Sequence, residues 1–194
     1  MKKAYLVITS LVIFSQIALS QNIRFGIDPG LAISRGSYKP DAGIDRRVYA
    51  GFDGGMFVEF GVAPKFMIRP EANYSMIGVE LNNGITEGTI KLRYVTIPVL
   101  AKANVCGGFN LLAGPQLGLL TAGNFDPSGN GASTDIKEDF KSTDFGLVLG
   151  AEYKFGGKIF LGTRYVLGLQ QIAEDGHGFE MKNRYISFRV GYIF

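Results

Sequence analysis

The sequence lacks tryptophan and has only one cysteine and one histidine among its 194 residues. A disulfide needs two cysteines, and the usual zinc sites need several Cys or His ligands, so Cys106 and His177 can build neither. Charged residues are also scarce, at 19% where an ordinary soluble domain has about 25%. These deficits argue against a disulfide scaffold, a zinc protein and an ordinary soluble enzyme.

A strong excess of positive charge is missing as well. The formal net charge is +3, with 20 basic and 17 acidic residues. Lys2 and Lys3 belong to an N-terminal segment that we expect to be removed, which leaves 18 basic and 17 acidic residues, or +1. No electrostatic case for a nucleic-acid partner remains.

The N-terminal segment has the layout of an export signal. Lys2 and Lys3 supply the positive region, a mostly apolar stretch follows, and Ala18 and Ser20 are small residues at a cleavage site. The stretch is too short and too interrupted for a membrane-anchoring helix. We therefore predict that residues 1–20 are a cleaved signal peptide and residues 21–194 a single domain. Gln21 would then be the first residue, which excludes a lipid-anchored cysteine there.

Glycine and aromatic residues are abundant instead, with 27 Gly, 15 Phe and 9 Tyr. Beyond residue 24, apolar residues alternate with small or polar ones, and such a period of two predicts half-buried β-strands. Residues 92–103 are less regular, and Pro98 suggests a bulge or a change of phase there. No segment shows a convincing helical period. The predicted strands are residues 25–33, 48–60, 66–76, 92–103, 109–119, 143–155, 159–169 and 185–194.

The connections between these strands alternate in length. Short turns follow the second, fourth and sixth strands, whereas long polar loops follow the others, the longest being residues 120–142. An up-and-down antiparallel barrel with an even strand count puts every second connection at the same end, and outer-membrane barrels combine short turns with long loops in this way. The pattern predicts an all-β, eight-stranded antiparallel up-and-down barrel.

The residue types decide which face of this barrel points outward. A soluble, lipocalin-like barrel would turn its apolar face inward, whereas a membrane barrel turns it towards lipid. The small or polar face combines many glycines with charged residues, which suits a narrow lumen. The apolar face carries aromatics near strand ends, as in the girdles of membrane barrels: Phe60, Phe66, Tyr94, Phe109, Tyr153, Phe155 and Tyr192. We therefore predict a transmembrane barrel, with Tyr192 and Phe194 as a C-terminal assembly signal.

Several stretches resemble a known family in the same order along the chain. They read IRPEANYS from Ile68, YVTIPVLAK from Tyr94, LAGP from Leu112 and FGLVLGA from Phe145. Together they resemble the PorT-type outer-membrane β-barrel family, and the resemblance covers essentially all of residues 21–194. It implies an eight-stranded outer-membrane protein, often described as porin-like, with no general biochemical activity. One member of that family is tied to secretion across the outer membrane.

Six charged residues form the most suggestive constellation, because opposite charges from neighbouring strands would meet in the lumen. They are Arg69, Glu71, Arg93, Glu152, Arg164 and Arg189. They could line an ion-conducting path or form a buried ion-pair network that fills the barrel. Asp28, Asp53 and Glu59 share this face and bring it close to neutrality, which favours the structural network, since a selective pore needs one dominant sign.

Sites for catalysis, metals or cofactors are not apparent. His177 lies beside acidic residues in a loop but has no recognisable Ser or Asp partner motif. The stretch from Asp126 resembles the opening of a calcium loop, yet Lys137 stands where the bidentate Glu is required. Nothing near Cys106 marks a reactive thiol. We predict a protein that is not an enzyme and has no cofactor.

The predicted function is that of an outer-membrane scaffold whose long loops bind or adhere to a partner. The alternatives are a small-solute channel and, less favoured, an accessory factor of protein secretion. The expected partners are outer-membrane lipid, the barrel-assembly and periplasmic chaperone machinery, and an extracellular or secretion-system partner whose identity the sequence leaves open.

Overall fold

The computed structural model describes residues 23–34, 37–39, 45–82, 87–129, 131–174 and 180–194. Residues 1–20, the predicted signal peptide, lie outside these ranges, as does His177. In the described ranges the regular structure is β-strand, apart from the short 3-10 helix η1 (Lys137–Asp139). No described helix is long and apolar enough to span a membrane.

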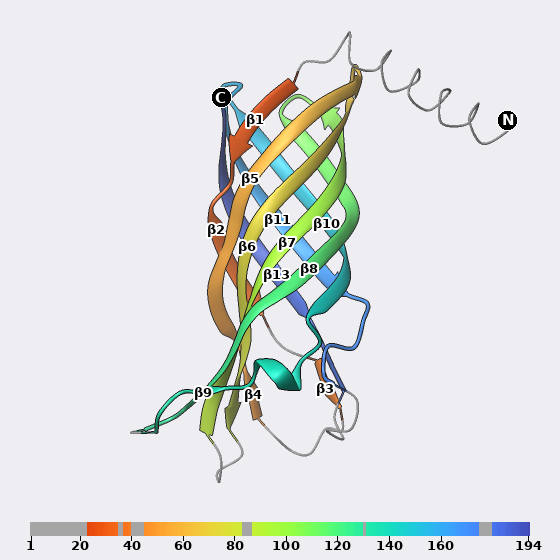
Figure 1. Cartoon of the computed structure of the whole chain (residues 1–194). Helices are drawn as coiled ribbons and strands as arrows, with labels where there is room; N and C mark the ends of the chain where they lie inside the picture. The colour runs from red at the N-terminus through yellow and green to blue at the C-terminus, as the bar shows by residue number, and fades with distance from the viewer. Residues whose placement is uncertain (1–22, 35–36, 40–44, 83–86, 130, 175–179) are drawn as a thin grey trace, which may run out of the picture.

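Antiparallel strands close into an eight-stranded barrel, in which β1 and β2 together form one wall between β5 and β13. Each wall pairs with the next wall along the chain, and β13 returns to β1 and β2 (Figure 1). The predicted all-β, up-and-down antiparallel barrel is confirmed. The barrel strands are β1 (Ile23–Ile27), β2 (Gly30–Ser34), β5 (Tyr49–Ala63), β6 (Phe66–Asn82), β7 (Glu87–Cys106), β8 (Phe109–Pro127), β10 (Thr143–Phe155), β11 (Ile159–Gly168) and β13 (Arg184–Ile193).

The first wall differs from the single strand predicted over residues 25–33. It breaks between β1 and β2 at Asp28 and Pro29, because proline has no N–H to donate to a ladder. The backbone stays tied to its neighbours, since Asp28 N donates to Gly55 O over 3.0 Å and Val190 N donates to Pro29 O over 3.0 Å. The break leaves the Asp28 side chain fully buried in the lumen.

Three neighbouring strands are much longer than a membrane crossing requires. β6, β7 and β8 contain 17, 20 and 19 residues, whereas a tilted transmembrane strand needs about 9–11. Their excess length lies at the end of the long loops (Figure 1), where β4 (Asp45–Arg47) pairs with β6 and β9 (Thr134–Asp135) pairs with β8. A second small sheet there joins β3 (Ser37–Lys39) to β12 (Glu180–Lys182). We call the part formed by β4, the outer ends of β6 to β8, and β9 the protruding sheet.

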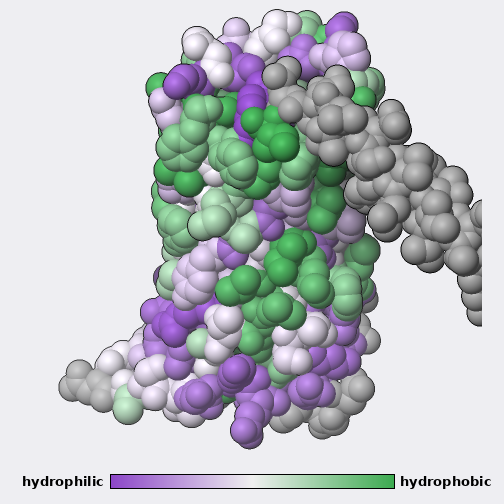
Figure 2. Space-filling model, turned by 45° about the horizontal axis from the view of Figure 1, so that its top comes forward, coloured by the Kyte–Doolittle hydropathy of each residue, from purple (hydrophilic) through white to green (hydrophobic). Residues whose placement is uncertain are grey.

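The outer surface of the barrel is apolar. In β13 exposed and buried residues alternate without interruption, and the exposed ones include Ile186, Phe188 and Val190. Figure 2 shows hydrophobic side chains over the middle of one face and hydrophilic ones towards both ends. This arrangement is the reverse of a soluble barrel and suits a surrounding of hydrocarbon, as predicted.

The orientation of β7 corrects two expectations. Even-numbered residues from Leu92 to Lys102 face inward without a change of phase, so the bulge expected at Pro98 is absent. Tyr94, expected in the outer aromatic girdle, is therefore buried inside at 2% exposure, and Arg93, expected inside, faces outward. The predicted orientation of these two residues was wrong because it assumed that polar residues face inward. At the level of Arg93 and Tyr94 the interior of the barrel is apolar.

Two glycines make room for aromatic rings inside the barrel. A Cβ at Gly26 would overlap the Phe57 ring, and one at Gly191 would overlap the Phe160 ring. These two rings meet edge to face, with their centroids 5.8 Å apart. Glycine in this lumen therefore serves ring packing as well as the long charged side chains for which the sequence suggested it.

Candidate functional site

A network of paired charges fills the lumen from the short turns to the middle of the barrel, and Arg69 on β6 lies at its centre. The Arg69 guanidinium lies 2.9 Å from Asp28 Oδ2, 2.9 Å from Glu71 Oε1 and 2.8 Å from Glu152 Oε2. It also covers the Phe57 ring, 3.5 Å from the ring centroid. One side chain thus joins carboxylates from three walls of the barrel.

Lys102 extends the network towards the short turns. Its Nζ lies 2.6 Å from Glu59 Oε1 and also contacts Glu152 Oε1. The second oxygen of Glu59 lies 3.0 Å from Arg24 Nη2, so this carboxylate is held from two sides. Lys102 and Glu59 are both almost completely buried.

Arg164 and Arg189 extend the network towards the long loops. Arg164 contacts Asp28 Oδ2 at 2.8 Å and Glu71 Oε2 at 2.6 Å. Arg189 contacts Asp28 Oδ1 at 3.1 Å and Asp53 Oδ2 at 2.5 Å. Asp28, placed inside by the break in the first wall, therefore accepts from three arginines when Arg69 is included.

Positive and negative charges are matched in this network. Each of its carboxylates has a cation within 4.0 Å, and five carboxylates face five cations: Asp28, Asp53, Glu59, Glu71 and Glu152 against Arg24, Arg69, Lys102, Arg164 and Arg189. Charges removed from water are tolerable only when they are paired and hydrogen-bonded, and these are. A selective pore would carry one dominant sign. The arrangement acts as a tightly held, neutral filling.

The structure brings together five of the six predicted lumen residues: Arg69, Glu71, Glu152, Arg164 and Arg189. Arg93 does not join them, because it faces outward and donates to Asn124 Oδ1 over 3.1 Å. Sequence reasoning left out Lys102, although its even-numbered position beyond Leu100 would have placed it inside. The structural role of the network stays a prediction.

The lumen near the long loops is filled by apolar side chains instead. Val79, Leu92 and Leu120 from the barrel walls form one cluster with Phe140 and Ile172 from two long loops. Backbone bonds tie these loops together, since Lys141 N donates to Ile172 O over 2.7 Å and Glu174 N donates to Asp139 O over 3.0 Å. Phe140 also forms an isolated β-bridge with Ala173. We call this part the apolar cap.

The other sequence candidates give no catalytic or metal centre in the described part of the chain. Cys106 is an exposed free thiol and the last residue of β7. Asp126, from the calcium-like stretch, lies 2.7 Å from Lys91, and hydrogen bonds from Lys91 and then Ser133 lower the pKa of its carboxyl. No group of three His, Cys, Asp or Glu suited to a metal lies in the described ranges.

The predicted assembly signal lies on the outer surface at the end of the short turns (Figure 1). Tyr192 is 38% exposed and Phe194 is 68% exposed, and their rings meet edge to face with centroids 5.4 Å apart. The Lys158 ammonium lies 5.6 Å from the Tyr192 ring centroid. Both side chains are thus accessible from outside the barrel, and their role in assembly stays a prediction.

Comparison with protein families gives one match to most of the chain. Residues 14–174 match the model of the outer membrane protein beta-barrel domain. This match confirms the outer-membrane β-barrel family that the sequence resemblance implied. The narrower PorT-type assignment stays a prediction. Comparison with curated protein sequences gave no match.

Solved structures with a similar fold include those of two bacterial proteins. Neisserial surface protein A (NspA) is 12% identical with a TM-score of 0.53, and the match covers 87% of this chain and 95% of that one. Ail, the attachment invasion locus protein of Yersinia pestis, is 14% identical with a TM-score of 0.50, and the match covers 88% and 98% of the two chains. At such identities the similarity shows the fold.

Proposed function

This chain belongs to the family of outer membrane protein β-barrel domains, and we propose that it is a non-catalytic scaffold whose loops bind or adhere to a partner. Outer-membrane lipid surrounds its apolar wall, and the barrel-assembly and periplasmic chaperone machinery delivers it after removal of residues 1–20. The protruding sheet and the long loops carry specificity, and the lumen carries none.

The filled lumen is the observation that carries this proposal. Five ion-paired carboxylates occupy one half, and the apolar cap occupies the other. A barrel of eight strands is just wide enough for its own side chains, so little room remains for solute. β6, β7 and β8 extend well past the apolar band, so part of each strand lies outside the membrane. This favours a loop function over a small-solute channel.

A complementation experiment separates the loop function from the channel. A deletion strain receives wild-type protein, a variant in which residues 128–133 are replaced by a two-residue turn, or the lumen variant Arg164→Met with Glu71→Leu. We expect the loop variant to reproduce the deletion phenotype and the lumen variant to restore the wild type. Heat-dependent gel mobility checks that each barrel is folded. The reverse outcome, together with single-channel conductance of wild-type protein in planar bilayers, would establish the channel instead.

The PorT-type resemblance adds a narrower proposal, in which the loop partner is a component of a secretion system. It rests on the motifs around Pro70, Pro98 and Pro115. The measurement is the amount of exported protein in the medium of the deletion strain. If the deletion strain exports normal amounts of protein but has an adhesion defect, the secretion role is excluded and the scaffold function is retained.

A further inference from the structure

One five-residue pattern occurs on two opposite walls of the barrel. It reads KLRYV from Lys91 on β7, and KNRYI from Lys182 at the end of β12 into β13. In both copies the lysine, the arginine and the last residue face outward, whereas the two residues between them are buried. Both strands run from the long loops towards the short turns, and three walls separate them on either side. Two opposite faces of the barrel therefore present the same pair of cations at the same end.

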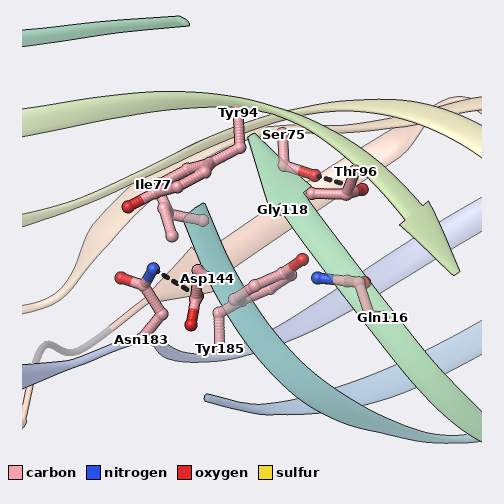
Figure 3. A pocket seen from close by; sticks show the side chains of 9 residues that line it. All are labelled: Ser75, Ile77, Tyr94, Thr96, Gln116, Gly118, Asp144, Asn183 and Tyr185. Atoms are coloured by element: carbon pink, nitrogen blue, oxygen red, sulfur yellow. Dashed lines mark hydrogen bonds between the residues drawn. The ribbon is translucent and has the colours of Figure 1, made fainter. Parts of the chain in front are cut away.

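The inward side of this pattern is filled by the barrel itself. Tyr94 and Tyr185 come from the two opposite walls and line one pocket (Figure 3), whose volume is about 10 Å³. That is room for about one water molecule. Leu92, beside Tyr94 in the chain, has no exposed area. The lumen has no room for a ligand at this level, so a ligand of Arg93 or Arg184 must lie outside the barrel.

The position of Arg93 along β7 places it at the edge of the membrane. The outward residues from Val95 to Val105 are all valine, isoleucine or alanine. At about 3.4 Å per residue and a tilt of about 40°, this stretch covers about 26 Å along the membrane normal, which matches the apolar band of a membrane barrel, about 25 Å tall. Arg93 is the next outward residue, about 5 Å beyond the band, and lipid headgroups extend about 5–7 Å beyond the hydrocarbon. Arg184 has the same position beyond Ile186 on β13.

The copy on β7 keeps one positive charge that the protein does not neutralise. Lys91 lies 2.7 Å from Asp126 and forms an ion pair with it. The Arg93 guanidinium donates to Asn124 Oδ1 over 3.1 Å, and this amide oxygen carries no charge. In the described part of the chain, no carboxylate oxygen lies within 4.0 Å of Arg93. Its remaining N–H groups are therefore available to an anion from outside.

The copy on β13 has fewer partners still. Lys182 Nζ donates to the backbone oxygen of Leu169 over 3.1 Å, and Arg184 is exposed. Neither cation has a carboxylate oxygen within 4.0 Å among the residues that the structure describes. A positive charge beside hydrocarbon is costly unless an anion pairs with it. Because the guanidinium fork matches a phosphate group with two parallel hydrogen bonds, both copies favour phosphate as that anion.

We propose that each copy binds the phosphate group of a lipid in the leaflet on the long-loop side. The arginine is the main ligand, and the lysine adds a second cation. Val95 or Ile186 begins the apolar wall on which the acyl chains of the same lipid lie, and this continuity favours a lipid over a soluble phosphate. Two such lipids on opposite walls hold the barrel at a fixed height in the membrane. This inference does not depend on what the loops bind, so its test can fail without affecting the proposed function.

Native mass spectrometry of the detergent-folded protein tests both sites, with dioleoyl phosphatidic acid as the probe at a concentration that just saturates the wild type. Wild type should retain two lipids, whereas Arg93→Gln and Arg184→Gln should each retain one, because loss of the charged hydrogen bonds weakens a site by about tenfold or more. The double variant should retain none. Dioleoylglycerol, which has the same chains without phosphate, should not be retained by wild type. Equal retention of phosphatidic acid by wild type and the double variant would overturn the proposal.

Controls separate the lipid sites from a general effect of charge. Lys137→Gln removes an exposed cation from the loop that carries Phe140 and should retain two lipids, as wild type does. Excess inorganic phosphate should leave the lipids in place, and their release would assign the sites to a soluble anion instead. Heat-dependent gel mobility checks that each barrel is folded. If Arg93→Gln does not fold, Arg93→Lys provides the test, because it keeps the charge but loses the fork and should bind several-fold more weakly.

Discussion

The two halves of the lumen are lined by the same strands but filled by opposite kinds of side chain. Near the short turns Arg69 and its neighbours make a network in which every carboxylate is paired. Near the long loops Leu92 and Leu120 pack against Phe140 and Ile172. Ion pairs depend on distance and direction, whereas apolar packing depends mainly on volume. The ionic half should therefore tolerate substitution much less than the apolar half.

The largest effect is expected for Arg69→Ala. The substitution removes one cation from three buried carboxylates, Asp28, Glu71 and Glu152, and breaking buried pairs costs about 3–5 kcal/mol. The measurement is the free energy of unfolding in urea, from gel mobility of barrels refolded in lipid vesicles. Arg93→Ala is the control, since that side chain faces outward and should change stability by less than about 0.5 kcal/mol.

A somewhat smaller effect is expected for Ile172→Ala in the apolar cap. Ile172 has no exposed area, and loss of its side chain should cost about 3 kcal/mol in the same unfolding assay. Conservative changes sharpen the comparison. Ile172→Val should cost about 1 kcal/mol, whereas Arg69→Lys should stay close to Arg69→Ala because an ammonium cannot replace the forked guanidinium. Equal tolerance of the two conservative changes would contradict the contrast between the halves.

A third prediction concerns Gly191, where a methyl group would overlap the Phe160 ring. Gly191→Ala should lower the free energy of unfolding by about 1–3 kcal/mol through overpacking. Gly162→Ala is the matched control, because its added Cβ would meet its nearest neighbours at 3.6 Å, an ordinary contact. Adding Phe160→Leu should recover part of the loss in Gly191→Ala. No recovery would indicate that the strain lies in the backbone instead.

The smallest effect belongs to the protruding sheet, where Lys91 and Asp126 form a pair that solvent reaches. Hydrogen bonding by Lys91 lowers the pKa of Asp126 below its usual 3.8, so the pair contributes stability above that pH. The contribution is lost as the pH falls through the lower, folded value. Urea midpoints of wild type and Asp126→Asn should thus differ slightly at neutral pH and converge in acid. High salt should reduce the difference, unlike that for the buried network.

Much of the fold was predictable from local pattern. The period of two identified every wall of the barrel, and the alternation of short and long connections predicted how the walls follow one another. Local pattern failed where the chain departs from a simple ladder. The break at Pro29 was missed because the alternation runs through it. The lengths of β6 to β8 were missed because, beyond the apolar band, the apolar residues such as Val79 and Leu92 face inward instead of outward.

The charge network was predictable as a set of residues but not as a set of contacts. Alternation placed Arg69, Glu71 and Arg164 on one face, yet it could not reveal that Asp28 accepts from three arginines across the lumen. It also misplaced Arg93, because the assignment assumed a polar interior along the whole barrel. At the level of Arg93 the inward neighbours are Leu92 and Tyr94, so the charged side chain is the outward one.

The sequence by itself determined the class of the protein, because a two-residue period and an apolar outward face follow directly from the order of residues. Only the tertiary structure decided how the lumen is filled. Contacts across the barrel join residues such as Asp28 and Arg189 that lie far apart in the chain, and the loops that supply Phe140 and Ile172 fold back over the strands. Those contacts depend on strand stagger and closure, which no local pattern encodes.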